Sequence, residues 1–381
     1  MKNREVAPSR LHSSLFILHS SFVWFGVLVG ALVVFGAFVV SLGQDPLAAM
    51  LAIAGGAFGT AQGLNRTVAR ATPLLLLSAG LLVAFRARFW NIGLNGAMFM
   101  GAVTASGIGL YHPDGPGWLI LPLMLVGAVL VGALWALVPG VLRVAFGAPE
   151  IIVSLMLNYV AARITDFLSI SYWKDPGGRG FPGTALLAQD FWLPRLGETN
   201  VHLGLLFGSL AMLGVAVLLG RTVWGLEISF VGQSLGTARH LGVNVSRTIL
   251  MVAAISGGLA GLAGASEVAG LNHRLESGIT QDLGYTAILV ASLGLLRPAG
   301  AALCSFLVAG LLVGGDQLQI RFGLPSALSG VMLWALLYGL INAQALSRGQ
   351  GARGRGKGSS VEHPLPLSPF PLPPPRSGHG P

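Results

Sequence analysis

Charge and cysteine are both scarce in this sequence. Only 10% of the 381 residues are charged, whereas a soluble globular domain is charged at roughly a quarter of its positions. So few charges cannot cover a surface that faces water, which excludes a soluble globular protein. The single cysteine, Cys304, excludes an internal disulfide and a cysteine-ligated metal cluster. Its position in an apolar run indicates a small buried hydrophobic residue.

Catalytic and nucleotide-binding motifs are also missing. The sequence has no HExxH, no GxSxG and no cluster of histidines and cysteines. It has no GxxxxGKS or GxxxxGKT, so the chain does not bind ATP through a P-loop. We therefore expect a protein that is not an enzyme and that holds no metal or cofactor itself. An intramembrane enzyme stays open as an alternative, although no residue stands out as a nucleophile with its base.

Long hydrophobic runs are what the sequence has in place of charge. Hydrophobic residues make up 53% of the chain, and the mean hydropathy is +0.73. The runs are continuous rather than alternating, which favours membrane helices over the short strands of a barrel. We predict an all-α fold, a polytopic integral membrane protein with about ten transmembrane helices. The expected spans are 22–42, 71–86, 91–111, 118–138, 150–170, 202–220, 248–270, 283–296, 299–314 and 325–345.

Some of these spans are short or broken. Those at 71–86, 283–296 and 299–314 are shorter than the ~20 residues that cross a bilayer. Short spans interrupted by glycine are common where a helix breaks beside a cavity. The run 47–60 is shorter still, and we expect it to lie at the outer surface or to re-enter the membrane.

Lysine and arginine indicate the orientation of the chain. With the N-terminus inside, the predicted inner segments hold most of these residues, including Arg143, Arg221 and Arg297. The positive-inside rule then places both termini in the cytoplasm. We expect the protein to lie in the plasma membrane of the cell. The net charge of +9 is explained by this orientation and does not require nucleic acid. The first apolar run exceeds the h-region of a signal peptide, so we expect no cleavage there.

Three regions divide the chain. We expect residues 1–21 to be a cytoplasmic tail, residues 22–346 to be the membrane domain, and residues 347–381 to be a disordered cytoplasmic tail. Two loops of the membrane domain are long, residues 171–201 outside and residues 221–247 inside. One sizeable loop on each face predicts a partner on each face.

Polar side chains occur inside the predicted spans. Asn91 and Asn95 lie four residues apart in the stretch ARFWNIGLNGAMFMGA, and Ser154 and Asn158 have the same spacing, so each pair shares a helix face. Polar residues inside a membrane face the bundle interior or an aqueous cavity. One interpretation is hydrogen bonding between helices, worth about 0.6 kcal/mol on average. The other is a break at Asn91 to Gly96, whose freed N–H groups meet water or a polar solute on a substrate path.

Glycines are concentrated in the span at 248–270. The stretch SGGLAGLAGASEVAG places Gly257 and Gly261 in a GxxxG pattern, with Gly258 and Gly264 nearby. Small residues at this spacing let two helices approach closely. The four glycines therefore predict a helix-packing face.

Five stretches of the sequence resemble the permease subunits of bacterial ABC importers. FWNIGLNGAMFMGA at 89–102 is similar to FNIGAEGQMLIGA in the branched-chain amino acid, ribose and nucleoside permease family. GAPEIIVSLMLNYVA at 147–161 is similar to GTNEVISTLMLNYIA, and FVGQSLGTARHLGVNV at 230–245 resembles AVGENPEAARYAGINV. The stretches at 255–275 and 283–303 complete the set in the same order. The LMLNY sequence is similar to that of the nucleoside-type members.

The resemblance implies an importer with two permease subunits, two cytoplasmic ATPases and an external solute-binding protein. The second permease would be a different chain, and ATP and Mg would be bound by the partner ATPases. Surrounded by membrane lipid, this chain would form the path for a small polar solute. A nucleoside is the first expectation, and a simple sugar or a branched-chain amino acid is the alternative.

The inner loop would then be the segment that couples the permease to the ATPase. The resemblance implies a short helix that docks in a groove of the ATPase, with turns at Gly232 and Gly242. Ala238 would lie in the groove, and Arg239 would face acidic groups of the partner. Gly236 departs from the family pattern, which often has an acidic residue there.

The sequence also departs from the family pattern along the expected path. Asn95 and Ala97 stand where the family has Glu and Gln, which removes a charge from the path. A secondary transporter or channel stays open as an alternative. Ion coupling usually needs carboxylates at mid-membrane, however, and Asp166 and Glu267 are expected near the outer face.

Overall fold

The computed structural model describes most of the predicted membrane domain: residues 29–177, 183–197, 199–323 and a few positions between 330 and 339. The chain divides into two units, and everything below belongs to the unit formed by residues 28–339. Both predicted tails and most of the predicted span at 325–345 lie outside the described residues.

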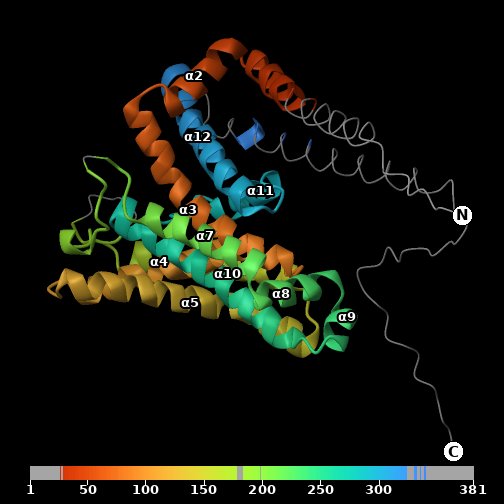
Figure 1. Cartoon of the computed structure of the whole chain (residues 1–381). Helices are drawn as coiled ribbons and strands as arrows, with labels where there is room; N and C mark the ends of the chain where they lie inside the picture. The colour runs from red at the N-terminus through yellow and green to blue at the C-terminus, as the bar shows by residue number, and fades with distance from the viewer. Residues whose placement is uncertain are drawn as a thin grey trace, which may run out of the picture. The chain divides into compact units, whose positions relative to one another are not determined.

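Helices make up nearly all of the regular structure in the described part of the chain (Figure 1). The first helix, Val29–Ser41, precedes a series whose bounds are α2 Pro46–Phe58, α3 Ala61–Arg86, α4 Leu94–Tyr111, α5 Gly117–Phe146, α6 Glu150–Phe167, α7 Gly204–Arg221, α8 Val223–Gln233, α9 Leu235–His240, α10 Val245–Glu267, α11 Leu283–Leu293 and α12 Pro298–Phe322. The π-helical turns η1 Leu168–Tyr172 and η3 Val268–Asn272 extend α6 and α10, and η2 Gln189–Phe191 is a 3-10 turn. The predicted all-α class is confirmed.

Six helices of the described chain are long and apolar enough to cross a membrane. The first helix and α2, bent by 113° at the break between them, make a seventh if the pair is one span. The predicted number of about ten is not confirmed for the described residues. Two predicted spans miss the criterion for physical reasons: asparagine and glycine lower the hydropathy of α4, and α11 has only 11 residues.

Two of the spans predicted to be short are full length, which corrects the sequence-based boundaries. α3 has 26 residues and α12 has 25. Arg66 and Arg70 lower the hydropathy of the first ten residues of α3, and Asp316 does so near the end of α12, yet both helices continue through these positions. Only α11 remains short.

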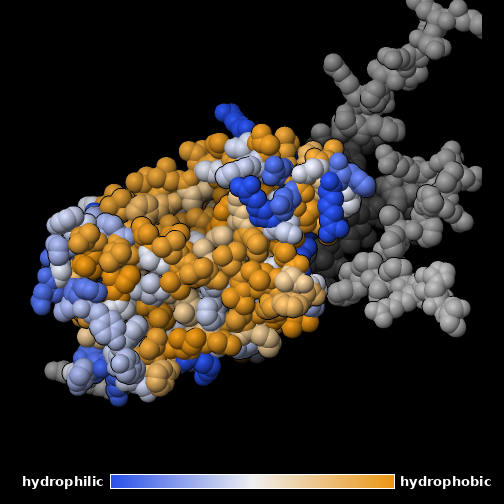
Figure 2. Space-filling view, turned by 90° about the horizontal axis from the view of Figure 1, so that it is seen from below, coloured by the Kyte–Doolittle hydropathy of each residue, from blue (hydrophilic) through white to orange (hydrophobic). Residues whose placement is uncertain are grey.

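The outer helices of the unit expose apolar surface. In the most apolar stretch of α3, 89% of residues are buried, whereas the corresponding values for α5, α6 and α7 are 28%, 22% and 22%. Figure 2 shows hydrophobic residues over most of the visible face, with hydrophilic side chains gathered in patches. A surface of this kind is suited to lipid or to an apolar partner rather than to water.

Helix α10 is the centre of the packing, lying against α3, α4 and α5 (Figure 1). A Cβ atom at Gly261 would meet the carbonyl oxygen of Ala128 on α5, and one at Gly264 would meet that of Met98 on α4. Backbone atoms cannot move aside as a flexible side chain can, so only glycine allows this approach. Of the four glycines expected on a packing face, Gly257, Gly261 and Gly264 lie at such close backbone contacts, and Gly258 faces Val129 of α5 at a more ordinary distance.

Candidate functional site

The break predicted around Asn91 lies in the non-helical segment between α3 and α4, since α4 begins at Leu94. The Asn91 side chain is fully buried. Its Oδ1 accepts a hydrogen bond from the N–H of Gly93 at 3.1 Å, and its Nδ2 donates to Ser256 Oγ on α10 at 2.9 Å. Asn91 therefore fixes a local turn of the segment and attaches it to the central helix.

Asn158 of α6 supplies the hydrogen bonds that the start of α4 lacks. The N-cap of α4 is Gly93, which has no side chain to accept from the first turn. Asn158 Oδ1 instead accepts from the Gly96 N–H at 2.7 Å, while its Nδ2 donates to the Ile92 carbonyl at 3.0 Å and to Tyr285 Oη at 3.0 Å. A side chain from another helix thus caps α4, because unpaired N–H groups at a helix start need an acceptor.

Asn95 of α4 caps the start of α11 in the same way. The N-cap of that helix is Asp282, which has a φ of +57° and makes no side-chain capping bond. Asn95 Oδ1 accepts from the Gly284 N–H at 2.7 Å, and its Nδ2 donates to Asp282 Oδ1 at 3.3 Å. The starts of α4 and α11 are therefore joined through asparagine side chains rather than through their own caps.

The four residues proposed from sequence for the substrate path form a buried framework around these breaks. Ser154 is 1% exposed, and its Oγ donates to the Ile151 carbonyl of its own helix at 3.2 Å. Asn91, Asn95 and Asn158 are 0%, 2% and 4% exposed and are hydrogen-bonded to protein groups. Within this chain the three asparagines therefore make hydrogen bonds between segments, which was one of the two interpretations of the sequence.

The segment before α11 lies alongside α6. Residues 273–282 lead from the end of η3 to α11 without forming a regular helix. Ser277 Oγ donates to Asp166 Oδ1 on α6 at 2.6 Å, and Asp166 also pairs with Arg163 at 3.1 Å. Together with the bond between Asn158 and Tyr285, this contact makes a polar seam along α6. Non-helical backbone at membrane depth is tolerated where protein buries it or where it lines an aqueous cavity.

Two residues of this seam were missed by sequence reasoning. Asp282 is exposed, and its carboxylate lies within hydrogen-bonding distance of Asn95. Asn95 is the position at which the family pattern has a charged Glu and this sequence does not. Tyr285 is half-buried and bonded to Asn158. The available signal was an aspartate directly before a short predicted span, but it lies 187 residues along the chain from its partner.

The inner segment predicted as a loop at 221–247 is helical instead, formed by α8 and α9 (Figure 1). Gly232 was expected to make a turn, which is wrong. It lies inside α8, where a Cβ would meet the carbonyl oxygen of Arg86, so glycine is needed for close packing rather than for a turn. Gly242 has a φ of +78° and does form the turn after α9, where glycine carries no steric penalty.

The faces of α9 also differ from the expectation. Ala238 was placed in the groove of a partner, but its side chain is 0% exposed and packs in the core of its own chain. Leu235, Arg239 and Leu241 are exposed, at 41% and 58% for the two leucines. The side chains available to a partner at α9 and its C-cap are therefore Leu235, Arg239 and Leu241, and Ala238 is not among them.

A histidine cluster connects the long outer loop to the end of α10. The rings of Trp192 and His273 stack with 3.7 Å between centroids, and Arg195 Nη2 lies 3.1 Å from His273 Nε2. His202 is 1% exposed, and its Nδ1 accepts from the Gly204 N–H at 3.1 Å. Burial, followed by the charges of His273 and Arg195, lowers the pKa of His202 to about 4. Burial and then Arg195 also lower the pKa of His273.

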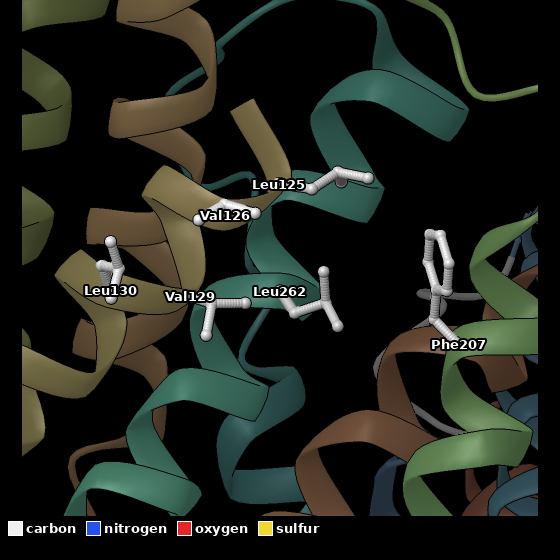
Figure 3. Close-up of a pocket in the computed structure, with 6 residues that line it drawn as sticks. All are labelled: Leu125, Val126, Val129, Leu130, Phe207 and Leu262. Carbon is white, nitrogen blue, oxygen red and sulfur yellow. The ribbon is translucent and has the colours of Figure 1, made fainter. Parts of the chain in front are cut away.

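Two cavities of the described chain do not suit a polar solute. One of about 250 Å³ has only hydrocarbon side chains in its wall, with Phe207 facing the others across the gap (Figure 3): Leu125, Val126, Val129, Leu130, Phe207 and Leu262. Another is partly lined by Arg66, Arg70 and Asp316, but its volume of about 150 Å³ is small compared with ordinary ligand pockets of about 300 Å³ or more. Among the described residues, no group of three His, Cys, Asp or Glu side chains is placed to hold a metal ion.

Comparison with known proteins identifies the family to which the chain belongs. A family model described as the permease component of branched-chain amino acid transport systems matches residues 63–341. The chain is 31% identical to a glucose ABC transporter permease of Haloferax volcanii, over 84% of this chain and 87% of that one. It is 29% identical to a guanosine ABC transporter permease of Bacillus subtilis, over 84% and 91%. It is 25% identical to a nucleoside ABC transporter permease of Lactococcus lactis, over 82% and 87%.

Proposed function

Because the chain belongs to the permease component family of branched-chain amino acid transport systems, we propose that it is the ABC importer subunit that forms a path for nucleosides. The choice of a nucleoside as substrate is based on the similarity to the guanosine and nucleoside permeases, which covers 84% and 82% of the chain. A simple sugar is the second candidate, favoured by the 31% identity to the glucose permease.

The buried asparagine framework supports a path along α4, α6 and α11. Asn91, Asn95 and Asn158 hold the starts of two helices within the membrane domain, and Ser154 is buried one turn before Asn158 on α6. Broken helices of this kind are the usual setting of transporter solute sites, because they present backbone and side-chain hydrogen-bonding groups at membrane depth. In this proposal the four residues shape the wall of the path, while exposed neighbours contact the solute.

In this proposal the energy for transport comes from ATP hydrolysis by partner chains. Two ATPases hold ATP and Mg, and the exposed face of α9 docks on one of them. Leu235 and Leu241 offer apolar contact and Arg239 offers a charge, while Gly242 sets the turn that follows. α9 leads directly into α10, so a movement of the docked helix would reach the centre of the packing.

The remaining partners are assigned to the other faces. The outer loop at 171–201 receives the solute-binding protein, and the exposed apolar helices α5, α6 and α7 face lipid or a second, different permease chain. The α8–α9 end lies in the cytoplasm together with both chain termini.

The test is uptake by the reconstituted importer. The chain is placed in proteoliposomes with the ATPase, second permease and binding protein of the same importer. Labelled guanosine should enter only when ATP is supplied on the ATPase side, and labelled glucose and leucine should not. Uptake of glucose alone would favour the sugar importer. Guanosine uptake that persists without ATP and collapses with an ion gradient would replace the proposal with a secondary transporter.

A further inference from the structure

The Asp282 carboxylate makes few hydrogen bonds to the residues around it. It occupies the N-cap position of α11, yet its carboxylate makes no capping bond to the helix. Its side chain accepts a hydrogen bond from Asn95 Nδ2 at 3.3 Å, and the residue is exposed. Since an ionised carboxylate has about four acceptor positions, most of its capacity remains for another ligand.

The start of α11 lies near the middle of the membrane. α11 has 11 residues and is therefore about 16 Å long, roughly half of a 30 Å hydrocarbon core. Asn158, which bonds to Tyr285 in the first turn of α11, lies eight residues after the start of α6, about 12 Å along a helix of 18 residues. Both helix lengths therefore support a position of the α11 start, where Asp282 lies, near mid-depth.

A carboxylate at this depth cannot face hydrocarbon. Charged residues inside a membrane face the bundle interior or a water-filled space. Asp282 is exposed on its own chain, so the bundle interior does not cover it. The surface on which Asp282 lies must therefore face water or the space between two permease chains.

The groups around Asp282 fit a solute rich in hydroxyls. Tyr285 Oη accepts from Asn158 Nδ2, which leaves its own proton free to donate. Thr286 Oγ bonds to the Asp282 carbonyl at 3.3 Å, and the Gln281 side chain accepts from Arg70. Asp282 and Tyr285 are three residues apart at the start of α11, and a carboxylate acceptor and a phenol donor at this spacing suit neighbouring hydroxyls, which both donate and accept.

We propose that Asp282 is the solute-contacting carboxylate of the path, and that with Tyr285 it binds the vicinal hydroxyls of an uncharged polyhydroxylated solute. These hydroxyls belong either to the ribose of a nucleoside or to a free sugar. The inference rests on the proposed transport function and names the residues that contact the solute within it. Asn95 acts as a positioning residue, since it holds the carboxylate beside the start of α11.

The first test measures whether water reaches Asp282. Cys304 is replaced by alanine, and Asp282→Cys and Leu134→Cys are introduced separately in the assembled importer. Leu134 is the control because it is 63% exposed on the apolar surface of α5. A charged, membrane-impermeant thiol reagent should modify the cysteine at 282, more slowly with solute and binding protein present, and should spare the one at 134. Equal lack of reaction at both positions would overturn the inference.

The second test uses Asp282→Asn, which keeps the size of the side chain and an acceptor for Asn95. Uptake should fall about tenfold or more, because a hydrogen bond to a charged group is lost. Binding-protein-stimulated ATP hydrolysis and the thermal unfolding temperature should remain at wild-type values. Asp114→Asn, which removes an exposed carboxylate from the turn between α4 and α5, is the matched control and should leave uptake unchanged.

The outcomes separate this inference from the proposed function. A loss confined to guanosine assigns the ribose hydroxyls, and a loss confined to glucose assigns those of a free sugar. Full uptake by Asp282→Asn, or a parallel fall of uptake and unfolding temperature, would show that Asp282 does not contact the solute. Absence of uptake by the wild-type importer would instead overturn the transport function itself.

Discussion

Asn158 illustrates how much a single carboxamide can hold together inside a membrane protein. It bonds to the Gly96 N–H and the Ile92 carbonyl on one side and to Tyr285 on the other. Asn158→Leu leaves a buried N–H and a buried carbonyl without partners, at a cost of about 1–3 kcal/mol for each such group. We expect a lower thermal unfolding temperature in detergent and a loss of uptake.

Thr165→Val on the same helix is the matched control for Asn158→Leu. The Thr165 hydroxyl is also buried, but it bonds only to the Ala161 carbonyl of its own helix, at 2.9 Å. Its removal should change the unfolding temperature little. Equal losses in the two variants would mean that the bonds between segments have no special role.

His202 should make the stability of the outer region depend on pH. Its pKa is about 4 in the folded chain and 6.5 in the unfolded chain, chiefly because of burial. Between these values the unfolded chain binds a proton that the folded chain does not, so the free energy of unfolding falls as the pH falls. The full contribution, about 3 kcal/mol, is present above pH 6.5 and is lost on approach to pH 4.

The measurement for His202 is the unfolding temperature between pH 7.5 and 4, which is compared for the wild type and His202→Asn. The Asn oxygen can accept from Gly204 in place of Nδ1, and it does not titrate. The slope between pH 6.5 and 4 should be smaller in His202→Asn. His112→Asn, at an exposed histidine, should keep the wild-type slope. An unchanged slope in His202→Asn would refute this assignment.

At the scale of elements, α9 combines exposed side chains, on which the proposed docking depends, with the buried Ala238, which packs in the core. Leu241→Glu changes an exposed side chain, so it should weaken co-purification of the ATPase and uptake while leaving the unfolding temperature unchanged. Ala238→Glu forces a charge into the core and should lower the unfolding temperature by itself. Leu196→Glu changes an exposed leucine of the outer loop and is the control for co-purification, which it should leave unchanged. ATPase binding that survives Leu241→Glu would contradict docking through this face.

The elements also show what could be predicted from sequence and what could not. The all-α class, the short α11 and the buried asparagines follow from local hydropathy and helical spacing. The lengths of α3 and α12 could not, because Arg66, Arg70 and Asp316 look like span boundaries when only the local sequence is considered. Capping between helices was equally hidden, since Asn95 and Gly284 are 189 residues apart and Asn158 and Gly96 are 62 apart.

Ala238 shows a second reason for such failures. A motif that resembles a docking segment identifies the region but does not tell which face of a six-residue helix is free. That face is decided by the chain segments that cover it. In this case the core of the same chain covers Ala238, and the partner is left with Leu235, Arg239 and Leu241.

For the whole molecule, the α8–α9 end should lie in the cytoplasm and the long outer loop outside. α8 packs on the end of α3 through the bond from Arg86 Nε to Ser229 Oγ at 2.9 Å, so the C-terminal end of α3 and the α8–α9 segment lie at one end of the bundle. Arg221 and Arg239 belong to the same end, and positively charged loops remain on the cytoplasmic side. This arrangement predicts opposite accessibility for the two loops.

Single cysteines in a Cys304→Ala background test that arrangement in intact cells and in inverted vesicles. A cysteine at the exposed Leu241, or at Ser347 outside the described residues, should react with a membrane-impermeant reagent only from the cytoplasmic side. A cysteine at the exposed Gly177 should react only from outside. Uptake by each variant serves as the control for a native fold. If positions 177 and 241 reacted from the same side, the helices between them would not cross the membrane as proposed, and the reverse pattern at both would invert the molecule. In either case α9 could not meet a cytoplasmic ATPase, so the coupling assigned to Leu241 depends on this orientation.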